Sequence, residues 1–171
     1  SEREPLTGLA NRYRLTNDSE KIVEQCFAEH KPLSFEILDI DYFKQLNDRY
    51  GHGKGDEGIC AVADTLKRIF PEDYVARYGG DEFLVVMTGR DREYAEEHAR
   101  QLCMGIRECE IPNEDSSVEP WLTISVGGVC AIPREPNRVW DFLSAADKTL
   151  YDQKNEQKGK VRFYVGEGQY L

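Results

Sequence analysis

A tight glycine turn between two apolar runs is the feature of this chain that limits its fold most. Residues 74–76 and 83–87 are largely apolar, and residues 77–83 read Arg-Tyr-Gly-Gly-Asp-Glu-Phe. Adjacent glycines accept a left-handed backbone without strain, so this pattern predicts a β-hairpin. Asp and Glu are depleted in strands, yet Asp81 and Glu82 stand where the second strand begins. Carboxylates beside a glycine turn favour a metal ion that bridges protein and phosphate, and a plain surface hairpin is the alternative.

A second acidic strand end lies earlier in the chain. Residues 33–41 read Leu-Ser-Phe-Glu-Ile-Leu-Asp-Ile-Asp, and apolar residues alternate along the first five positions. This alternation predicts a strand with Asp39 at its carboxyl end. Neighbouring strands can bring Asp39 close to Asp81, although the two residues are far apart in the sequence.

The remaining apolar pattern alternates between helical and strand periods, with no repeats and no linker. Strands interleaved with helices predict an α/β fold with a single sheet. Residues 111–120 form a polar, acidic loop. The periodicity predicts helices at 11–30, 41–50, 54–69, 92–109 and 139–157, and further strands at 122–129 and 161–165.

Composition limits the class of protein further. The 171 residues fit one domain, and 22 basic against 32 acidic residues give a net charge of −10, which argues against a nucleic-acid partner. No apolar run reaches the roughly 18 residues of a membrane span and no signal peptide opens the chain, so we expect a cytoplasmic domain without membrane contact. The five cysteines include no Cys-x-x-Cys pair, which favours reduced thiols over a zinc site.

Several motifs follow one another in a recognisable order. They are Glu-Pro-Leu-Thr-Gly-Leu-Ala-Asn-Arg at 4–12, Phe-Lys-Gln-Leu-Asn-Asp at 43–48, Gly-His-Gly-Lys-Gly-Asp at 51–56, Ser-Val-Gly at 125–127, and Ala-Asp and Leu-Tyr within 146–151. With the glycine turn, they closely resemble the GGDEF family, the diguanylate cyclases of bacterial signalling. The resemblance covers nearly the whole chain. It implies one mixed sheet of about five strands flanked by helices, with a βαββαβ core like that of nucleotidyl cyclases and polymerase palms.

The resemblance also implies an activity. Such a domain condenses two GTP molecules into cyclic di-GMP and two pyrophosphates, with two Mg²⁺ (or Mn²⁺) ions at each GTP site. Asp39, the Ile40 carbonyl, Asp81 and Glu82 would bind metal, and Asp81 or Glu82 would assist deprotonation of the attacking hydroxyl. Because each domain holds one GTP, we expect a homodimer. We also expect residues 1–171 to be a single GGDEF domain cut from a longer protein with an upstream sensor or receiver domain.

Recognition of guanine is implied for two residues, Asn47 and Asp56. A carboxylate can accept hydrogen bonds from both N1–H and the exocyclic amine of guanine, whereas adenine has no such pair of donors. The alternative for Asn47 is an ordinary Asn at a helix C-terminus, and the alternative for Asp56 is an ordinary charge at a helix N-terminus. His52 matches a substrate-contact position, and the alternative is a packed loop histidine. For Asp39 the alternative is a helix N-cap, and for Asp41 the N-cap is the role that we expect.

The glycine-rich segment 51–55 superficially suggests a phosphate-binding P-loop. Gly55 stands where Ser or Thr should hold magnesium, and a helix rather than a strand precedes the segment, so we reject this motif. By resemblance, Phe43, Gly79 and Gly80 contact substrate instead.

Three lysines are candidates to meet the phosphate charge: Lys44, Lys154 and Lys158. The family usually reads Lys-x-x-Gly-Arg near the last helix, whereas here Lys158 replaces the arginine and the glycine is displaced. A lysine supplies charge without the bidentate fork of arginine. The alternative is a solvated basic helix end that interacts favourably with the helix dipole.

One departure from the family concerns regulation. Many members carry Arg-x-x-Asp upstream of the glycine turn as an inhibitory product site, and here Phe70 replaces the arginine while Asp73 is retained. We therefore expect no strong feedback inhibition at that site. Two other functions stay open: a non-catalytic GTP or cyclic di-GMP binding module that regulates a partner, and a structural dimerisation domain. Neither explains the retained carboxylates as well as catalysis does.

Overall fold

The computed structural model describes residues 2–166 and 168–171 and contains five helices and five strands within these ranges. Their order along the chain is α1 (Arg12–Glu29), β1 (Leu33–Ile40), α2 (Phe43–Tyr50), α3 (His52–Ile69), β2 (Tyr74–Arg77), β3 (Glu82–Thr88), α4 (Arg92–Glu108), β4 (Ile124–Ala131), α5 (Val139–Glu156) and β5 (Val161–Phe163).

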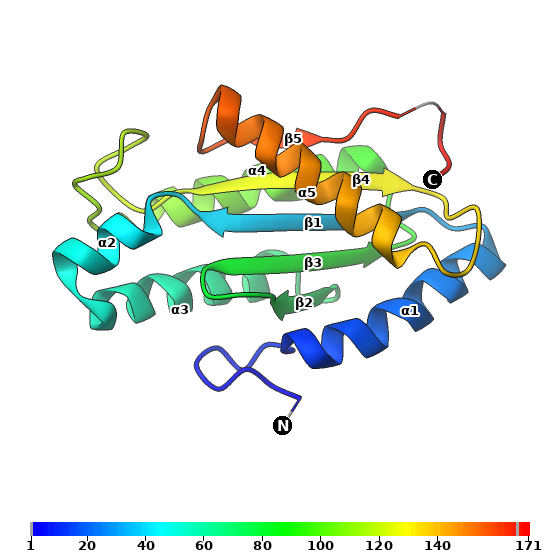
Figure 1. Cartoon of the computed structure of the whole chain (residues 1–171), viewed down its shortest axis with the longest axis horizontal. Helices are drawn as coiled ribbons and strands as arrows, with labels where there is room; N and C mark the ends of the chain where they lie inside the picture. The colour runs from blue at the N-terminus through cyan, green and yellow to red at the C-terminus, as the bar shows by residue number, and fades with distance from the viewer. Residues whose placement is uncertain (1, 167) are drawn as a thin grey trace.

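The strands form one mixed sheet in the order β2-β3-β1-β4-β5. The central strand β1 is antiparallel to both β3 and β4, β2 is antiparallel to β3, and β5 is parallel to β4. The predicted βαββαβ core is therefore confirmed, with α2 and α3 together forming the first connection. The predicted fold class, a single mixed sheet flanked by helices, is also confirmed (Figure 1).

Helices cover both faces of the sheet because successive side chains of β1 point to opposite faces. Leu38 and Ile40 pack in a core with α3 and α4, whereas Phe35 and Ile37 pack in a second core with α1 and α5. In Figure 1, α5 crosses in front of β1 and β4. None of the helices in the described ranges combines the length and apolar character that crossing a bilayer requires.

Element ends differ from the sequence predictions by a few residues for identifiable reasons. Helix α2 begins two residues late because Tyr42 has φ 54°, a left-handed conformation outside the helix. Strand β4 is displaced toward the C-terminus because its register follows β1, from Ile124 opposite Ile40 to Ala131 opposite Leu33. Helix α3 begins directly after Gly51 rather than at position 54.

The middle of β1 contains a carboxylic acid that the alternation did not single out. Glu36 is fully buried between Val85 of β3 and Gly128 of β4. Neither of its carboxyl oxygens has a hydrogen-bond partner among the described residues. Burial raises the pKa of Glu36 well above its ordinary value, and the negative charges of Asp73 and Glu96 raise it further. Glu36 therefore destabilises the fold whenever it must ionise.

We expect Glu36→Gln to stabilise the protein at alkaline pH. The pKa of Glu36 in the folded protein lies above its pKa in the unfolded chain. The free energy of unfolding is therefore highest below the unfolded-state pKa and declines as pH rises toward the folded-state pKa. Gln cannot ionise, so the free energy of unfolding at about pH 8 should rise by about 1–3 kcal/mol. Urea unfolding at about pH 5 and pH 8 measures this, with the exposed Glu93→Gln as control. An unchanged pH dependence in Glu36→Gln would contradict the assignment.

Candidate active site

The glycine turn and the end of β1 lie side by side at one end of the sheet. Asp39 is paired with Glu82 in the β1–β3 ladder. The backbone N–H of Ile40 donates to the Asp81 carbonyl at 3.3 Å, and the N–H of Gly79 donates to the Glu82 carbonyl at 3.2 Å, which closes the turn. The structure thus brings three acidic residues from two sequence segments to the same end of the sheet.

These carboxylates repel one another, and one lysine offsets part of their charge. Lys154 of α5 donates to Asp39 Oδ2 at 2.6 Å, while Asp39 Oδ1 is buried without a partner in the described residues. Burial, followed by the charge of Asp39, raises the pKa of Asp81. Burial raises the pKa of Glu82 as well, and Asp81 and Asp39 add to the increase. Burial lowers the pKa of Lys154, but the bond to Asp39 and the negative charges of Asp39, Asp41 and Asp81 together raise it overall.

The donor set at this end of the sheet suits a hard divalent cation. Carboxylates and a strand-end carbonyl are the oxygen ligands that Mg²⁺ and Mn²⁺ prefer, and the unpartnered Asp39 Oδ1 leaves one such ligand available. Within the part of the chain that the structure describes, no three His, Cys, Asp or Glu side chains already converge around one point. Lys154 supplies the positive charge at Asp39 in this arrangement. The residues therefore fit a metal chemically, and their side chains must draw together to hold it.

Asp41 is not a helix cap, and that prediction was wrong. Its Oδ2 accepts from Thr123 Oγ1 at 2.8 Å and its Oδ1 accepts from Ser125 Oγ at 2.5 Å. The residue at the N-cap of α2 is Tyr42, which makes no side-chain capping bond. Burial raises the pKa of Asp41, although both hydroxyl bonds act in the opposite direction. The cap alternative for Asp39 is excluded too, because Asp39 lies within β1.

The two residues predicted to read guanine lie near the junction of α2 and α3. Asn47 Oδ1 is buried and has no hydrogen-bond partner among the described residues. A Cβ atom on Gly55 would lie 1.8 Å from that oxygen, so glycine alone leaves room for the amide. Asp56 and His52 are exposed on α3, and Phe43 is half-buried at the first residue of α2. The exposed Asp56 carboxylate can accept hydrogen bonds from a ligand that carries several N–H donors, whereas the Asn47 amide must turn away from Gly55 before its oxygen can do so.

A polar cavity of about 460 Å³ lies between the start of α2 and the end of α5. Lys154 and Lys158 both line it, and the Lys158 ammonium lies 5.5 Å from the centre of the Tyr42 ring. Lys44 lies outside this lining and pairs with Asp48 at 3.0 Å on the surface of α2. Sequence reasoning missed several residues of the cavity, since no local motif marks them: Tyr42, Arg107, Ser117 and Lys160.

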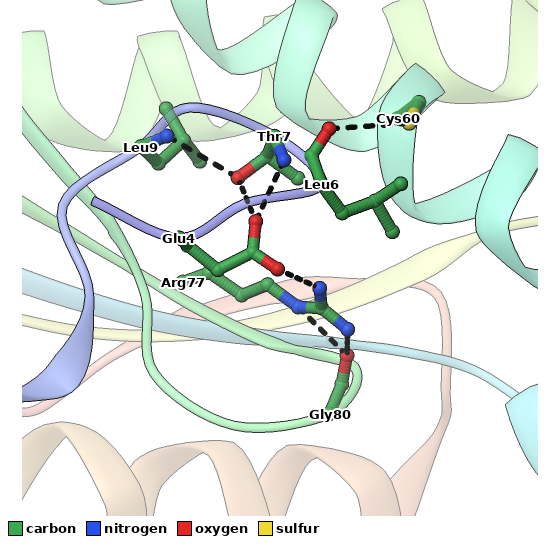
Figure 2. A network of polar contacts seen from close by, with 7 residues as sticks. All are labelled: Glu4, Leu6, Thr7, Leu9, Cys60, Arg77 and Gly80. Atoms are coloured by element: carbon green, nitrogen blue, oxygen red, sulfur yellow. Dashed lines mark hydrogen bonds and ion pairs between the residues drawn. The ribbon is translucent and has the colours of Figure 1, made fainter. Parts of the chain in front are cut away.

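The N-terminal segment supports the glycine turn from outside (Figure 2). Glu4 forms an ion pair with Arg77, whose Nη2 donates to the Gly80 carbonyl at 2.6 Å. The other oxygen of Glu4 accepts from the N–H and the hydroxyl of Thr7 at 2.6 and 2.7 Å. Burial alone would raise the pKa of Glu4, but the bonds from Thr7 and the charge of Arg77 hold it below its usual value. The exposed Gly80 thus has its backbone position set by residues outside the turn.

Phe70 faces the interior of the protein rather than a ligand. Its side chain is 1% exposed, and its ring centre lies 5.9 Å from that of His98. Asp73 is half-buried, and burial raises its pKa more than the positive charge of Arg90 lowers it. The lack of a strong inhibitory product site stays a prediction.

The order of elements and strands defines an α/β domain with a βαββαβ core, and this domain carries acidic residues at one end of its sheet. Comparison with known proteins identifies the family. The family described as "Diguanylate cyclase, GGDEF domain" matches residues 1–160. The chain therefore belongs to the GGDEF domain family.

Curated relatives agree with this assignment. The probable diguanylate cyclase DgcT of Escherichia coli (strain K12) is 35% identical over 162 residues, which cover 93% of this chain and 35% of DgcT. Diguanylate cyclase DgcM of the same strain is 33% identical over 91% of this chain and 37% of DgcM. The chain thus spans about a third of the length of these relatives.

Solved structures match over nearly the whole chain. The GGDEF domain of DgcB from Caulobacter crescentus, in complex with c-di-GMP, superposes with a TM-score of 0.85 at 26% identity and covers 95% of both chains. Diguanylate cyclase SiaD from Pseudomonas aeruginosa, in complex with its activator SiaC, has a TM-score of 0.82 at 28% identity over 95% of this chain and 62% of SiaD.

We expect Gly55→Ala to weaken guanine nucleotide binding selectively. The added methyl group must displace the Asn47 amide, so affinity for GTP should fall about tenfold or more while weak ATP binding changes little. Gly53→Ala is the matched control, because a Cβ there meets nothing within 4 Å. Calorimetric titration with each nucleotide measures the effect. Equal GTP affinities in the two variants would contradict the role given to Asn47.

Proposed function

We propose that this domain is a diguanylate cyclase that joins two GTP molecules into cyclic di-GMP and releases two pyrophosphates. The observation that carries the proposal is the meeting of Asp39, Asp81 and Glu82 at the glycine turn, next to a cavity lined by lysines. Membership of the GGDEF domain family supports it, as do relatives that are named diguanylate cyclases. A pure binding module has no need of three partly buried carboxylates that repel one another.

Substrate binding divides between two ends of the site. Asn47 and Asp56 accept hydrogen bonds from the guanine edge, with Phe43 and His52 beside them. Lys154 and Lys158 meet the negative charge of the phosphates. At the glycine turn, Gly79 and Gly80 allow the nucleotide to approach the backbone closely. Lys44 has a weaker claim on the phosphates, because it pairs with Asp48 outside the cavity.

The reaction forms one P–O bond and breaks another. The 3′ hydroxyl of one GTP attacks the α-phosphorus of the second, pyrophosphate leaves, and the hydroxyl proton passes to a carboxylate. Asp81 or Glu82 would accept this proton, because both lie at the glycine turn beside the end of β1. Lys154 offsets the charge of Asp39 and lines the cavity, where it can also contact the phosphates. A second attack in the opposite direction closes the ring.

The nucleotidyl transfer chemistry of this family needs a divalent metal ion. In this chain Asp39, the Ile40 carbonyl, Asp81 and Glu82 would hold two Mg²⁺ (or Mn²⁺) ions at each GTP site. Bound there, the ions would neutralise phosphate charge and lower the pKa of the attacking hydroxyl.

The active form has two domains face to face, because each supplies one GTP. We propose that this homodimer forms in the cytoplasm, where GTP is available, under the control of an upstream sensor or receiver domain in the longer protein. Lengths of the relatives are compatible with additional domains, since the chain covers about a third of DgcT and DgcM.

Wild-type protein at high concentration should convert GTP into cyclic di-GMP with Mg²⁺ or Mn²⁺ present. Asp81→Asn and Glu82→Gln should each lower the rate at least about a hundredfold, since both remove a charge on which the chemistry depends. The surface variant Glu108→Gln should match the wild type. Chromatography of the reaction products measures all four proteins. If the wild type binds GTP yet makes no cyclic di-GMP even when fused to a dimeric coiled coil, the domain is a binding module instead.

A further inference from the structure

The buried hydroxyl of Ser125 in β4 connects two turns that are far apart in the sequence. Ser125 Oγ donates to Asp41 Oδ1 at 2.5 Å, and the backbone N–H of Gly159 donates to Ser125 Oγ at 2.9 Å. Asp41 lies in the turn between β1 and α2, whereas Gly159 lies in the turn between α5 and β5. Ser125 itself is fully buried and is paired with Asp39 in the β1–β4 ladder. One side chain thus contacts the turn next to the carboxylates and the turn that follows Lys158.

The first of these turns is held by neighbours rather than by its own conformation. Tyr42 has φ 54°, which is uncommon for a residue other than glycine. Asn113 Nδ2 donates to the Tyr42 carbonyl at 3.3 Å, and the backbone N–H of Asp41 donates to the Thr123 carbonyl at 3.0 Å. The Asp41 carboxylate completes this support through its two hydroxyl bonds.

The second turn carries cations of the polar cavity. Gly159 has φ 80° and is flanked by Lys158 and Lys160, both of which line the cavity together with Lys154. Arg107 Nη2 donates to the Gly159 carbonyl at 2.9 Å. The N–H of Gly159 donates to Ser125 as well, so both backbone polar groups of Gly159 are fixed. A shift of this turn would therefore move positive charge relative to the carboxylates.

We propose that Ser125 is a positioning residue for the triphosphate of the nucleotide. Its hydroxyl donates to the Asp41 turn and accepts from the Gly159 turn at once, and so sets the distance between the carboxylate end of β1 and the lysines of the cavity. Alanine can do neither. This inference rests on the proposed function of the same site, and it gives a role to the Ser-Val-Gly segment at 125–127, which the chemistry above does not use.

Thr123 provides a matched comparison two residues earlier. It is 1% exposed, and its hydroxyl donates to the other oxygen of the same Asp41 carboxylate at 2.8 Å. No hydrogen bond from its side chain to the turn at Gly159 is present among the described residues. A merely structural role for the Asp41 network predicts that loss of either hydroxyl weakens the binding of triphosphate and monophosphate alike. A positioning role predicts that loss of the Ser125 hydroxyl lowers nucleotide affinity more than loss of the Thr123 hydroxyl, and only for ligands that carry the outer phosphates.

The test compares Ser125→Ala with Thr123→Val in calorimetric titrations with Mg²⁺. The probes are a non-hydrolysable α,β-methylene analogue of GTP and GMP, which lacks the outer phosphates. We expect Ser125→Ala to bind the triphosphate about tenfold more weakly than the wild type, and GMP within about twofold. Thr123→Val should bind both probes within about twofold of the wild type. The urea midpoint should fall further in Ser125→Ala, which loses two hydrogen bonds, than in Thr123→Val, which loses one. Ser125→Cys, whose slightly larger thiol is a weak donor and acceptor, replaces the alanine variant if that variant does not fold.

Two results would overturn the proposal: equal weakening of triphosphate binding in the two variants, or equal weakening of both probes in the Ser125 variant. Binding is measured without turnover, so the role of Ser125 is tested independently of whether the domain catalyses the proposed reaction. A wild type that binds the triphosphate but makes no cyclic di-GMP would refute the activity and leave the role of Ser125 to be judged by the titrations. A wild type that binds no triphosphate would overturn both.

Discussion

Two carboxylates at directly paired positions of neighbouring strands are the constraint on which the rest of the site depends. The register of β1 against β3 pairs Asp39 with Glu82, and Asp81 precedes Glu82 directly. Like charges at directly opposed positions destabilise a sheet, and burial increases the cost because water no longer screens them. Lys154 compensates one of the three. The fold therefore carries an unfavourable charge at this end, which a bound cation would relieve, and such local conflicts are expected where a protein gives up stability for function.

Support for this charged end comes from segments far away in the sequence. Arg77, paired with Glu4 of the N-terminal segment, binds the Gly80 carbonyl beneath the turn. On the opposite side, Ser125 joins the Asp41 turn to Gly159. These contacts explain why motifs at both ends of the chain accompany the glycine turn. Rigid backbone on both sides lets a small number of side chains keep their positions despite mutual repulsion.

Local pattern was sufficient to predict the elements that position the site. Alternating apolar residues identify β1, and adjacent glycines between apolar runs identify the β2–β3 hairpin, because both signals depend on neighbours in the sequence. The role of Asp41 could not be predicted in this way. A carboxylate just before a helix is typical of an N-cap, but here hydroxyl groups of β4 and the residue before it, more than 80 residues later, bind it instead. The left-handed Tyr42 and the unpartnered Glu36 were missed for the same reason, since tertiary packing determines both.

Thermal unfolding of Asp81→Asn, with and without Mn²⁺, tests most directly whether the carboxylates are a charge cluster that awaits a cation. Without metal, loss of one negative charge should raise the midpoint by about 2–4 °C, because repulsion from Asp39 and Glu82 decreases. Mn²⁺ should stabilise the wild type and have a much smaller effect on the variant. The exposed Asp64→Asn serves as control and should follow the wild type in both conditions. A lower midpoint for Asp81→Asn without metal, together with equal stabilisation of both proteins by Mn²⁺, would contradict this account.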